Sequence, residues 1–290
     1  LVTTTPDWQS YNDMPDNKIQ PSPSHMTQQP TFAEVYTPGN IPRVNLHKGY
    51  NSQGYQCDEF YKRKDLNVLL LGDSWVQGDG LPLDQCCAEL LRTRLSQYFG
   101  ASVANWNMAH GGKGYDYAAR TLLCSLDELR PDIVVLAFGV LDRREYFLPT
   151  GECVNFSLGT IGAIERGDRL ATPEIKRAFD SWSRLNNHYD DAALAIRSFK
   201  LIQTMLDARD IMWCFTTTPW EDTVSRIEEL VKFGWFSMKN YLGAPFDYCD
   251  HVSESNDHPG VNSHLKFAER VADWLISRHE ARIRELLRRK

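Results

Sequence analysis

The amino-acid sequence predicts an α/β protein in which a parallel sheet carries helices on both faces. Two observations lead to this prediction: short, wholly apolar runs recur along the chain, and segments with helical spacing separate them. Runs without polar alternation are typical of strands that are buried on both faces, as in parallel sheets. The alternation of such strands with helices favours one sheet between two helical layers.

The predicted elements follow in chain order. Four segments are expected to form buried strands: Asn67–Leu71 (NVLLL), Ser102–Ala109, Asp132–Gly139 (DIVVLAFG) and Ile211–Thr218 (IMWCFTTT). The expected helices are Asp84–Tyr98 with Asp84 as N-cap, Asp116–Leu129, Pro173 to about Ala208 with a break near Asn186-Asn187, and a final helix capped by Asn262 or Ser263. In sheets of this kind ligands bind beyond the carboxyl ends of the strands, so function is expected in the segments that follow them.

Composition excludes several classes of protein. The chain has 290 residues, 42% of them hydrophobic, which is too apolar for a disordered protein. A formal net charge of −6 argues against a nucleic-acid binder that relies on phosphate contacts. The longest apolar stretch, Ile133–Leu141, is about half the length needed to cross a bilayer, so we expect no membrane span.

The N-terminal region differs from the rest. Residues 1–44 are rich in Pro, Ser, Thr, Gln and Asn and have no structural period, so we expect an extended arm, either disordered or laid across another subunit or protein. A plain tail is the alternative. Residues 45–290 are expected to form the α/β domain. The opening LVTTTPDWQS has no signal-peptide pattern, which favours an intracellular, cytoplasmic protein, and the missing Met favours a processed product or part of a larger protein or assembly.

Cysteine usage points to a reducing environment. The seven cysteines are an odd number and form no C-x-x-C pair, and Cys124 and Cys214 lie in apolar contexts that are typical of core positions. Zinc would require clustered Cys and His at ligand spacing, so no metal is expected. The sequence implies no cofactor.

Two strand ends carry residues suited to acyl chemistry. Gly72-Asp73-Ser74-Trp75 follows the first strand and presents a serine at its tip, although serines also cap turns. His110-Gly111-Gly112-Lys113-Gly114 follows the second strand, and its bare backbone N–H groups suit an oxyanion or a phosphate, although a flexible turn is the alternative. The glycine spacings match neither a P-loop nor a dinucleotide fingerprint.

Two further segments add charge and a base. Arg143 and Arg144 follow the third strand and are expected either to bind an anion or carboxylate or to pair with Asp142 or Glu145 on a solvated surface. His258-Pro259-Gly260 precedes the final helix. A lone histidine is usually structural, but a histidine paired with a strand-tip serine can activate it as a nucleophile.

These segments resemble a known family. NVLLLGDS (67–74), NMAHGGKG (107–114) and HPGVNSHLKFA (258–268) resemble blocks I, II and V of the SGNH, or GDSL-type, hydrolases, and YNSQGYQCDEF (50–60) resembles the lead-in of bacterial and phage members. The resemblance spans about residues 45–280. It implies a three-layered, flavodoxin-like α/β fold and an esterase, lipase, carbohydrate O-deacetylase or acyltransferase activity. It also implies Ser74 as nucleophile, His258 as general base, and the backbone N–H groups of Ser74 and Gly112 in the oxyanion hole.

Two positions depart from the family pattern. Block III usually reads Gly-x-Asn-Asp, and its Asn completes the oxyanion hole, but position 141 is Leu, which cannot donate a hydrogen bond. The triad acid usually lies three residues before the histidine, at the position of Ser255. The residue that orients His258 is then Asp257, Glu254, Ser255 or a backbone carbonyl. Asp73, Trp75, Arg143 and Arg144 are candidates for substrate contacts, and either arginine is a candidate to replace the missing oxyanion donor.

The substrate and the rival functions follow from the same residues. Residues 148–172 form a long insertion expected to act as a lid and to line a groove with Trp75, Tyr115 and Tyr117. Aromatic faces suit sugar rings, so an O-acetyl ester of a glycan is the leading substrate, whereas the alternative is that these rings fill the core rim. Asn155-Phe156-Ser157 is a glycosylation sequon. The alternatives to a serine esterase are a weak or inactive scaffold that acts as an interaction protein, and an O-acyltransferase.

Overall fold

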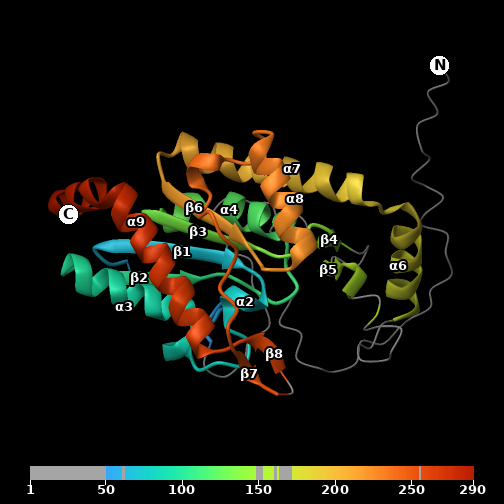
Figure 1. The fold of residues 1–290 in the computed structure, drawn as a ribbon, viewed down its shortest axis with the longest axis horizontal. Helices are drawn as coiled ribbons and strands as arrows, with labels where there is room; N and C mark the ends of the chain where they lie inside the picture. The colour runs from blue at the N-terminus through green and yellow to red at the C-terminus, as the bar shows by residue number, and fades with distance from the viewer. Residues whose placement is uncertain (1–49, 61–62, 148–152, 160–161, 163–171, 255) are drawn as a thin grey trace.

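The computed structural model describes residues 50–60, 63–147, 153–159, 162, 172–254 and 256–290. Its centre is a four-stranded parallel sheet with the order β2-β1-β3-β6 (Figure 1). The strands are β1 (Leu66–Gly72), β2 (Val103–Asn107), β3 (Ile133–Phe138) and β6 (Met212–Thr217). All four predicted strands are confirmed, with ends that differ by one or two residues. The predicted arm, residues 1–44, lies outside the described residues.

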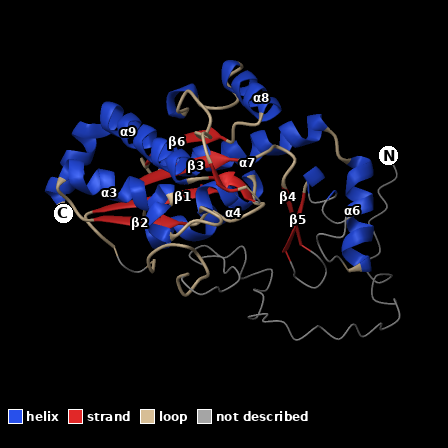
Figure 2. Ribbon diagram, turned by 60° about the horizontal axis from the view of Figure 1, so that its bottom comes forward, coloured by secondary structure: helices blue, strands red, loops and turns tan. Residues whose placement is uncertain are grey.

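Helices cover both faces of this sheet, which confirms the three-layered, flavodoxin-like α/β fold (Figure 2). One layer contains α4 (Tyr115–Leu129) and α7 (His188–Ala208), which pack together, and the other contains α3 (Cys87–Phe99) and α9 (Val261–Arg289). The helix α8 (Glu221–Lys232) adds Ile227 and Val231 to the α4–α7 side.

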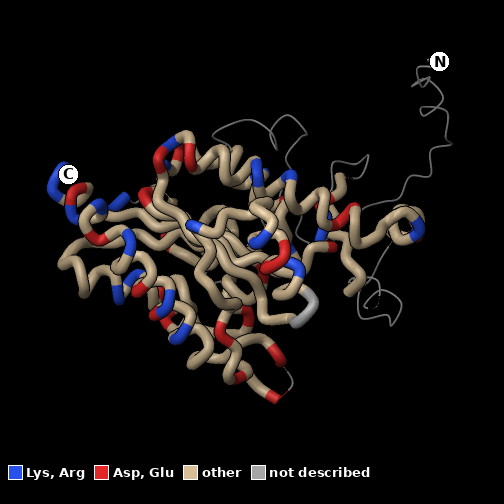
Figure 3. Tube along the Cα trace, turned by 45° about the horizontal axis from the view of Figure 1, so that its top comes forward, with Lys and Arg blue, Asp and Glu red and all other residues tan. Residues whose placement is uncertain are grey.

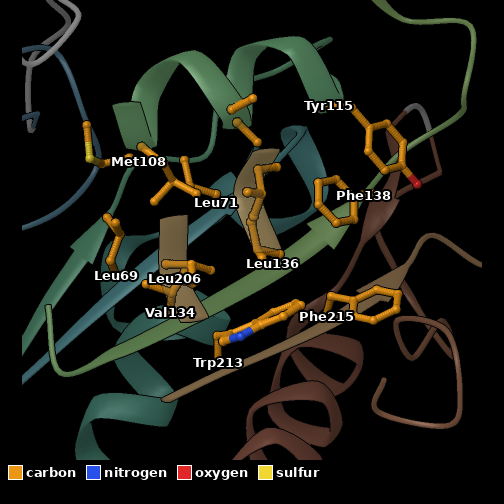
Figure 4. Packing of buried hydrophobic residues seen from close by; sticks show 14 of the residues in the cluster. Leu69, Leu71, Met108, Tyr115, Val134, Leu136, Phe138, Leu206, Trp213 and Phe215 are labelled. Atoms are coloured by element: carbon orange, nitrogen blue, oxygen red, sulfur yellow. The ribbon is translucent and has the colours of Figure 1, made fainter. Parts of the chain in front are cut away.

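Alternation along each strand divides the core between the two layers. In β1, Leu69 and Leu71 pack on the α4–α7 side, whereas Val68 and Leu70 pack on the α3–α9 side. Tyr115 of α4 stacks on Phe138 of β3, with ring centroids 4.1 Å apart (Figure 4). Because both faces are covered, β3 is apolar from end to end and β1 nearly so, which is why the sequence shows runs without alternation there.

Helix boundaries depended on local capping that the sequence showed only in part. The break in the long helix is confirmed: α6 (Pro173–Leu185) ends before Asn187, whose side chain accepts hydrogen bonds from the first N–H groups of α7. The predicted start at Asp84 is wrong, because Asp84 lies in the 3₁₀ helix η2 (Leu83–Gln85) and Cys86 is the N-cap of α3.

The predicted cap of the last helix is also wrong. Gly260 is the N-cap of α9, and a distant carboxylate, Asp250, accepts hydrogen bonds from the N–H groups of Asn262 at 2.9 Å and Ser263 at 2.8 Å. The first turn of α9 is therefore satisfied by the chain that precedes it, because helix N-termini need acceptors that their own residues need not supply.

Several short elements were not predicted. They are α2 (Ser74–Gln77), the hairpin β4 (Arg144–Phe147)–β5 (Cys153–Phe156), α8, the 3₁₀ helix η3 (Met238–Asn240) and the hairpin β7 (His251–Ser253)–β8 (Asn256–Pro259). Of the insertion at residues 148–172, the structure describes 153–159, 162 and 172.

The cysteines are reduced, and charges of both signs lie on the helices α3 and α9. All seven cysteines are free thiols, and Cys124 and Cys214 are fully buried, as predicted. Basic and acidic residues lie intermixed along α3 and α9 (Figure 3), where Arg94 pairs with Glu269 and Asp273. No helix in the described part of the chain has the length and apolarity that a bilayer crossing requires.

The protein is expected to lose stability in mild acid, because His264 is fully buried in α9. Its Nδ1 accepts a hydrogen bond from the Cys87 N–H at 2.9 Å, and burial lowers its pKa to about 4. The unfolded chain takes up the proton near pH 6.5, so stability should fall by about 3 kcal/mol between pH 6.5 and 4. Urea unfolding of His264→Asn, which keeps an acceptor but cannot titrate, should show a flatter pH profile. An equal slope in both proteins would contradict this prediction.

Candidate active site

Ser74 stands at the carboxyl edge of the sheet, as the first residue of α2 directly after β1. The turn requires Gly72, because a Cβ there would lie 2.5 Å from Val76 Cγ2 and 2.7 Å from the Ala137 carbonyl oxygen. Asp73 caps the helix by accepting a hydrogen bond from the Trp75 N–H at 3.0 Å. The N–H of Ser74 itself has no intrahelical acceptor, because it belongs to the first turn.

The glycine-rich loop lies against this turn. The Gly111 N–H donates to Gln77 Oε1 at 2.7 Å, and a Cβ built on Gly111 would lie 3.6 Å from Ser74 Cβ. The Lys113 N–H donates to the His110 carbonyl at 3.2 Å, which closes a turn in which Gly112 takes φ +74°. Glycine suits this left-handed position, and the preceding residue, Gly111, lies against Ser74. The loop geometry suits an oxyanion.

His258 lies on β8 and is oriented by a residue that the sequence analysis missed. Its Nδ1 lies 2.7 Å from Asn256 Oδ1, and its backbone N–H donates to the same oxygen at 3.1 Å. Neither Asp257 nor Glu254, both exposed, makes this contact, so the expectation that one of these acids orients the ring is wrong. Ser255 lies outside the described residues. The signal available was an Asn two residues before the His, since Asn side chains accept from the backbone two residues on.

The two reactive side chains come from elements that lie together. Helix α2 packs against β8, but among the hydrogen bonds of the described residues none joins Ser74 to His258. The Nε2 atom of His258 instead lies 3.9 Å from Asp79 Oδ2. His258 is about one quarter exposed, so its ring borders solvent. A base must form a hydrogen bond to the nucleophile, and such contacts often tighten only when substrate binds.

The two arginines after β3 have different places. Arg143 Nη1 pairs with the buried Asp73 carboxylate and donates to the Lys113 carbonyl at 3.4 Å, so Arg143 joins the turn before Ser74 to the glycine-rich loop. Arg144 is fully buried and donates to the Asp191 carbonyl at 2.7 Å, so the expectation that it contacts substrate is wrong. Leu141, at the block III position, is buried with the α4–α7 core.

Aromatic residues extend from the site toward solvent. Trp75 packs against Tyr248, with ring centroids 4.8 Å apart, and against Trp220 at 5.6 Å. Trp220 is 45% exposed and Tyr248 is 36% exposed, so these two rings, with Trp75 beneath them, form an aromatic platform. Tyr115 and Tyr117 are fully buried in the core, which contradicts the expectation that they line a groove.

A buried ion cluster supports the glycine-rich loop from the other side. Lys113 Nζ lies 3.3 Å from Glu145 Oε1, and Arg120 Nη2 lies 2.8 Å from the same oxygen. Burial alone would raise the pKa of Glu145, but Lys113 and Arg120 outweigh it and lower the pKa to about 2. Lys113 also donates to Asn155 Oδ1 at 3.1 Å. The cluster therefore joins the loop to the β4–β5 hairpin.

Solved structures match this chain in fold, whereas no protein-family model and no curated protein matches it. TesA is 15% identical over 72% of this chain and 98% of its own, with a TM-score of 0.45. The family 3 carbohydrate esterase of Clostridium thermocellum is 15% identical over 74% and 98%, with a TM-score of 0.45. The lipase/acylhydrolase of Enterococcus faecalis is 15% identical over 73% and 96%, with a TM-score of 0.42. This similarity concerns the fold alone.

Proposed function

We propose that the protein is a serine esterase that works through an acyl-enzyme, with Ser74 as nucleophile and His258 as general base. The observation that carries this proposal is the placement of Ser74 at a helix start beneath the glycine-rich loop, with Gly111 against its Cβ. The N–H groups of Ser74 and Gly112 are the proposed oxyanion donors. No hydrogen bond within the described residues uses either of them.

The reaction follows from these groups. Ser74 Oγ attacks the ester carbonyl carbon while His258 Nε2 takes its proton, and the carbonyl oxygen becomes an oxyanion facing the two N–H groups. Collapse breaks the bond to the alcohol, which leaves with the proton from His258. Water then attacks the carbonyl carbon of the acyl-enzyme and gives a proton to His258. The bond to Ser74 Oγ breaks, Oγ takes that proton from His258, and the acid leaves. Asn256 positions the His258 ring throughout.

The aromatic platform favours a carbohydrate ester as substrate. Trp220 and Tyr248 present partly exposed rings beside the residue that follows Ser74, and aromatic faces suit the apolar faces of sugar rings. We therefore propose an O-acetyl group on a glycan as the ester. The small acyl group fits a site in which Gly111 lies against the nucleophile.

A fluorophosphonate probe tests the proposal. The wild-type protein should become covalently labelled at Ser74 and should hydrolyse p-nitrophenyl acetate and release acetate from an acetylated oligosaccharide. Ser74→Ala should lose both labelling and turnover, because the nucleophile is absent. Peptide mapping by mass spectrometry locates the label. Equal labelling and equal turnover in the wild type and Ser74→Ala would reject the esterase and favour an inactive scaffold. Two observations agree with that alternative: Leu141 is apolar, and no hydrogen bond joins Ser74 to His258 in the described structure.

A further inference from the structure

The proposed oxyanion hole contains two backbone donors and lacks a side-chain donor at the block III position. Leu141 is buried against the α4–α7 core and has no group that can donate. An oxyanion site with one donor missing loses a large part of its stabilising effect. A donor from another element, placed beside Gly112, would restore it.

The side chain of Asn155, on β5, lies beside Gly112. A Cβ built on Gly112 would lie 3.9 Å from Asn155 Nδ2, and a Cβ built on the preceding residue, Gly111, would lie 3.6 Å from Ser74 Cβ. Two adjacent glycines of the loop thus lie against the nucleophile and against an amide nitrogen. The β4–β5 hairpin brings Asn155 to this place, because Asn155 pairs with Glu145 across the hairpin.

The orientation of this amide is fixed by chemistry. Asn155 Oδ1 accepts from Lys113 Nζ at 3.1 Å, and an ammonium group has only donors, so the oxygen must face Lys113 and Nδ2 must face away from it. Lys113 is in turn held by Glu145, which Arg120 also binds. Among the hydrogen bonds of the described residues, none has Asn155 Nδ2 as donor.

We propose that Asn155 Nδ2 is the side-chain donor of the oxyanion hole, in place of the donor that Leu141 cannot supply. This proposal rests on the proposed esterase function. Lys113 is the positioning residue, since it fixes which atom of the amide faces the site. The sequon that contains Asn155 is then part of the site, and its amide nitrogen is committed to the substrate.

Arg143 is the competing donor. Its Nη1 is committed to the Asp73 carboxylate and the Lys113 carbonyl, so the guanidinium holds the turn before Ser74 and the loop in register. The Asp73 carboxylate also offsets its charge. Asn155 differs because the contact of its Oδ1 with Lys113 orients the amide and leaves its donor end directed away from Lys113.

Kinetics of Asn155→Ala and Asn155→Asp test the proposal. With p-nitrophenyl acetate, kcat should fall about 100-fold or more while KM stays within about twofold, because the donor acts on the charge of the transition state. The inhibition constant of phenylboronic acid, whose adduct on Ser74 carries an oxyanion, should rise by a similar factor. Val154→Ala is the matched control, since it loosens the same strand at the neighbouring position and should keep kcat near the wild-type value.

Each other outcome counts against the donor. An Asn155→Ala kcat within about threefold of wild type, an equal loss in Val154→Ala, or loss of boronate affinity in Arg143→Ala but not in Asn155→Ala would overturn the role of Asn155 while leaving the esterase in place. Ser74→Ala is measured in parallel. If the wild-type protein shows no turnover above Ser74→Ala, the esterase and the donor are both rejected.

Discussion

Replacing His258 with alanine is expected to lower kcat/KM for p-nitrophenyl acetate by about 1,000-fold or more, because the variant lacks the proposed base that takes the Ser74 proton. Asn256→Ala should cause a smaller loss, roughly 10- to 100-fold, since the imidazole remains but loses the oxygen that holds its Nδ1 at 2.7 Å. Both variants should unfold in urea near the wild-type midpoint, because His258 and Asn256 lie at the partly exposed rim. Steady-state rates and urea midpoints measure the two effects separately.

Asp257 and Asp79 provide the discriminating variants. Asp257→Asn should leave kcat/KM near the wild-type value, because the carboxylate is exposed and the contact of Asp257 with Tyr248 is made by its backbone carbonyl, which accepts at 2.7 Å. Asp79→Asn removes the charge 3.9 Å from His258 Nε2 and should raise activity if that pairing holds the ring away from Ser74. A loss in Asp257→Asn as large as in Asn256→Ala would show that Asp257 orients the ring after all.

The sheet could be predicted from the sequence because its strands are buried on both faces. The run in β3 is apolar from end to end, and the runs in β1, β2 and β6 are buried although they include a few Asn and Thr residues. Helix α8 was missed because its sequence is mostly polar, with Ile227 and Val231 as its buried apolar residues. The two hairpins are three or four residues per strand, too short for a period to show.

The site could be predicted only where its contacts are local. Ser74 could be proposed because a strand, a glycine and a serine follow one another in the chain. Asn256 was missed because the family pattern points to position 255, whereas the ring is held by the oxygen two residues before it. The contact between Asn155 and the glycine-rich loop joins residues 42 positions apart, and the Asp250 cap of α9 joins residues 12 and 13 apart. No local pattern reports such distances.

Of the ion-paired residues in the described chain, Glu145 is the one whose replacement is expected to destabilise the protein most. Its side chain is 4% exposed and accepts from Arg120 at 2.8 and 2.9 Å and from Lys113 at 3.3 Å. Removing the carboxylate leaves two cationic side chains, each about 10% exposed, without compensation. Breaking a buried pair in this way costs about 3–5 kcal/mol, so Glu145→Gln should lower the free energy of unfolding in urea by that amount.

An exposed ion pair serves as the control for this prediction, and a pH series gives a second test of it. Asp127→Asn breaks the pair with Arg209, whose side chains are 62% and 40% exposed, and should cost less than about 1 kcal/mol. Because the pKa of Glu145 is lowered from 4.5 to about 2 in the folded protein, its contribution is present above about pH 4.5 and is lost as the pH falls toward 2. The gap between wild type and Glu145→Gln should therefore be constant near neutral pH and narrow in acid. A difference in free energy of unfolding below about 1 kcal/mol at pH 7 would contradict the prediction. It would mean that the protein tolerates the Lys113 and Arg120 cations without Glu145, so that Glu145 is not needed to hold Lys113 beside Asn155.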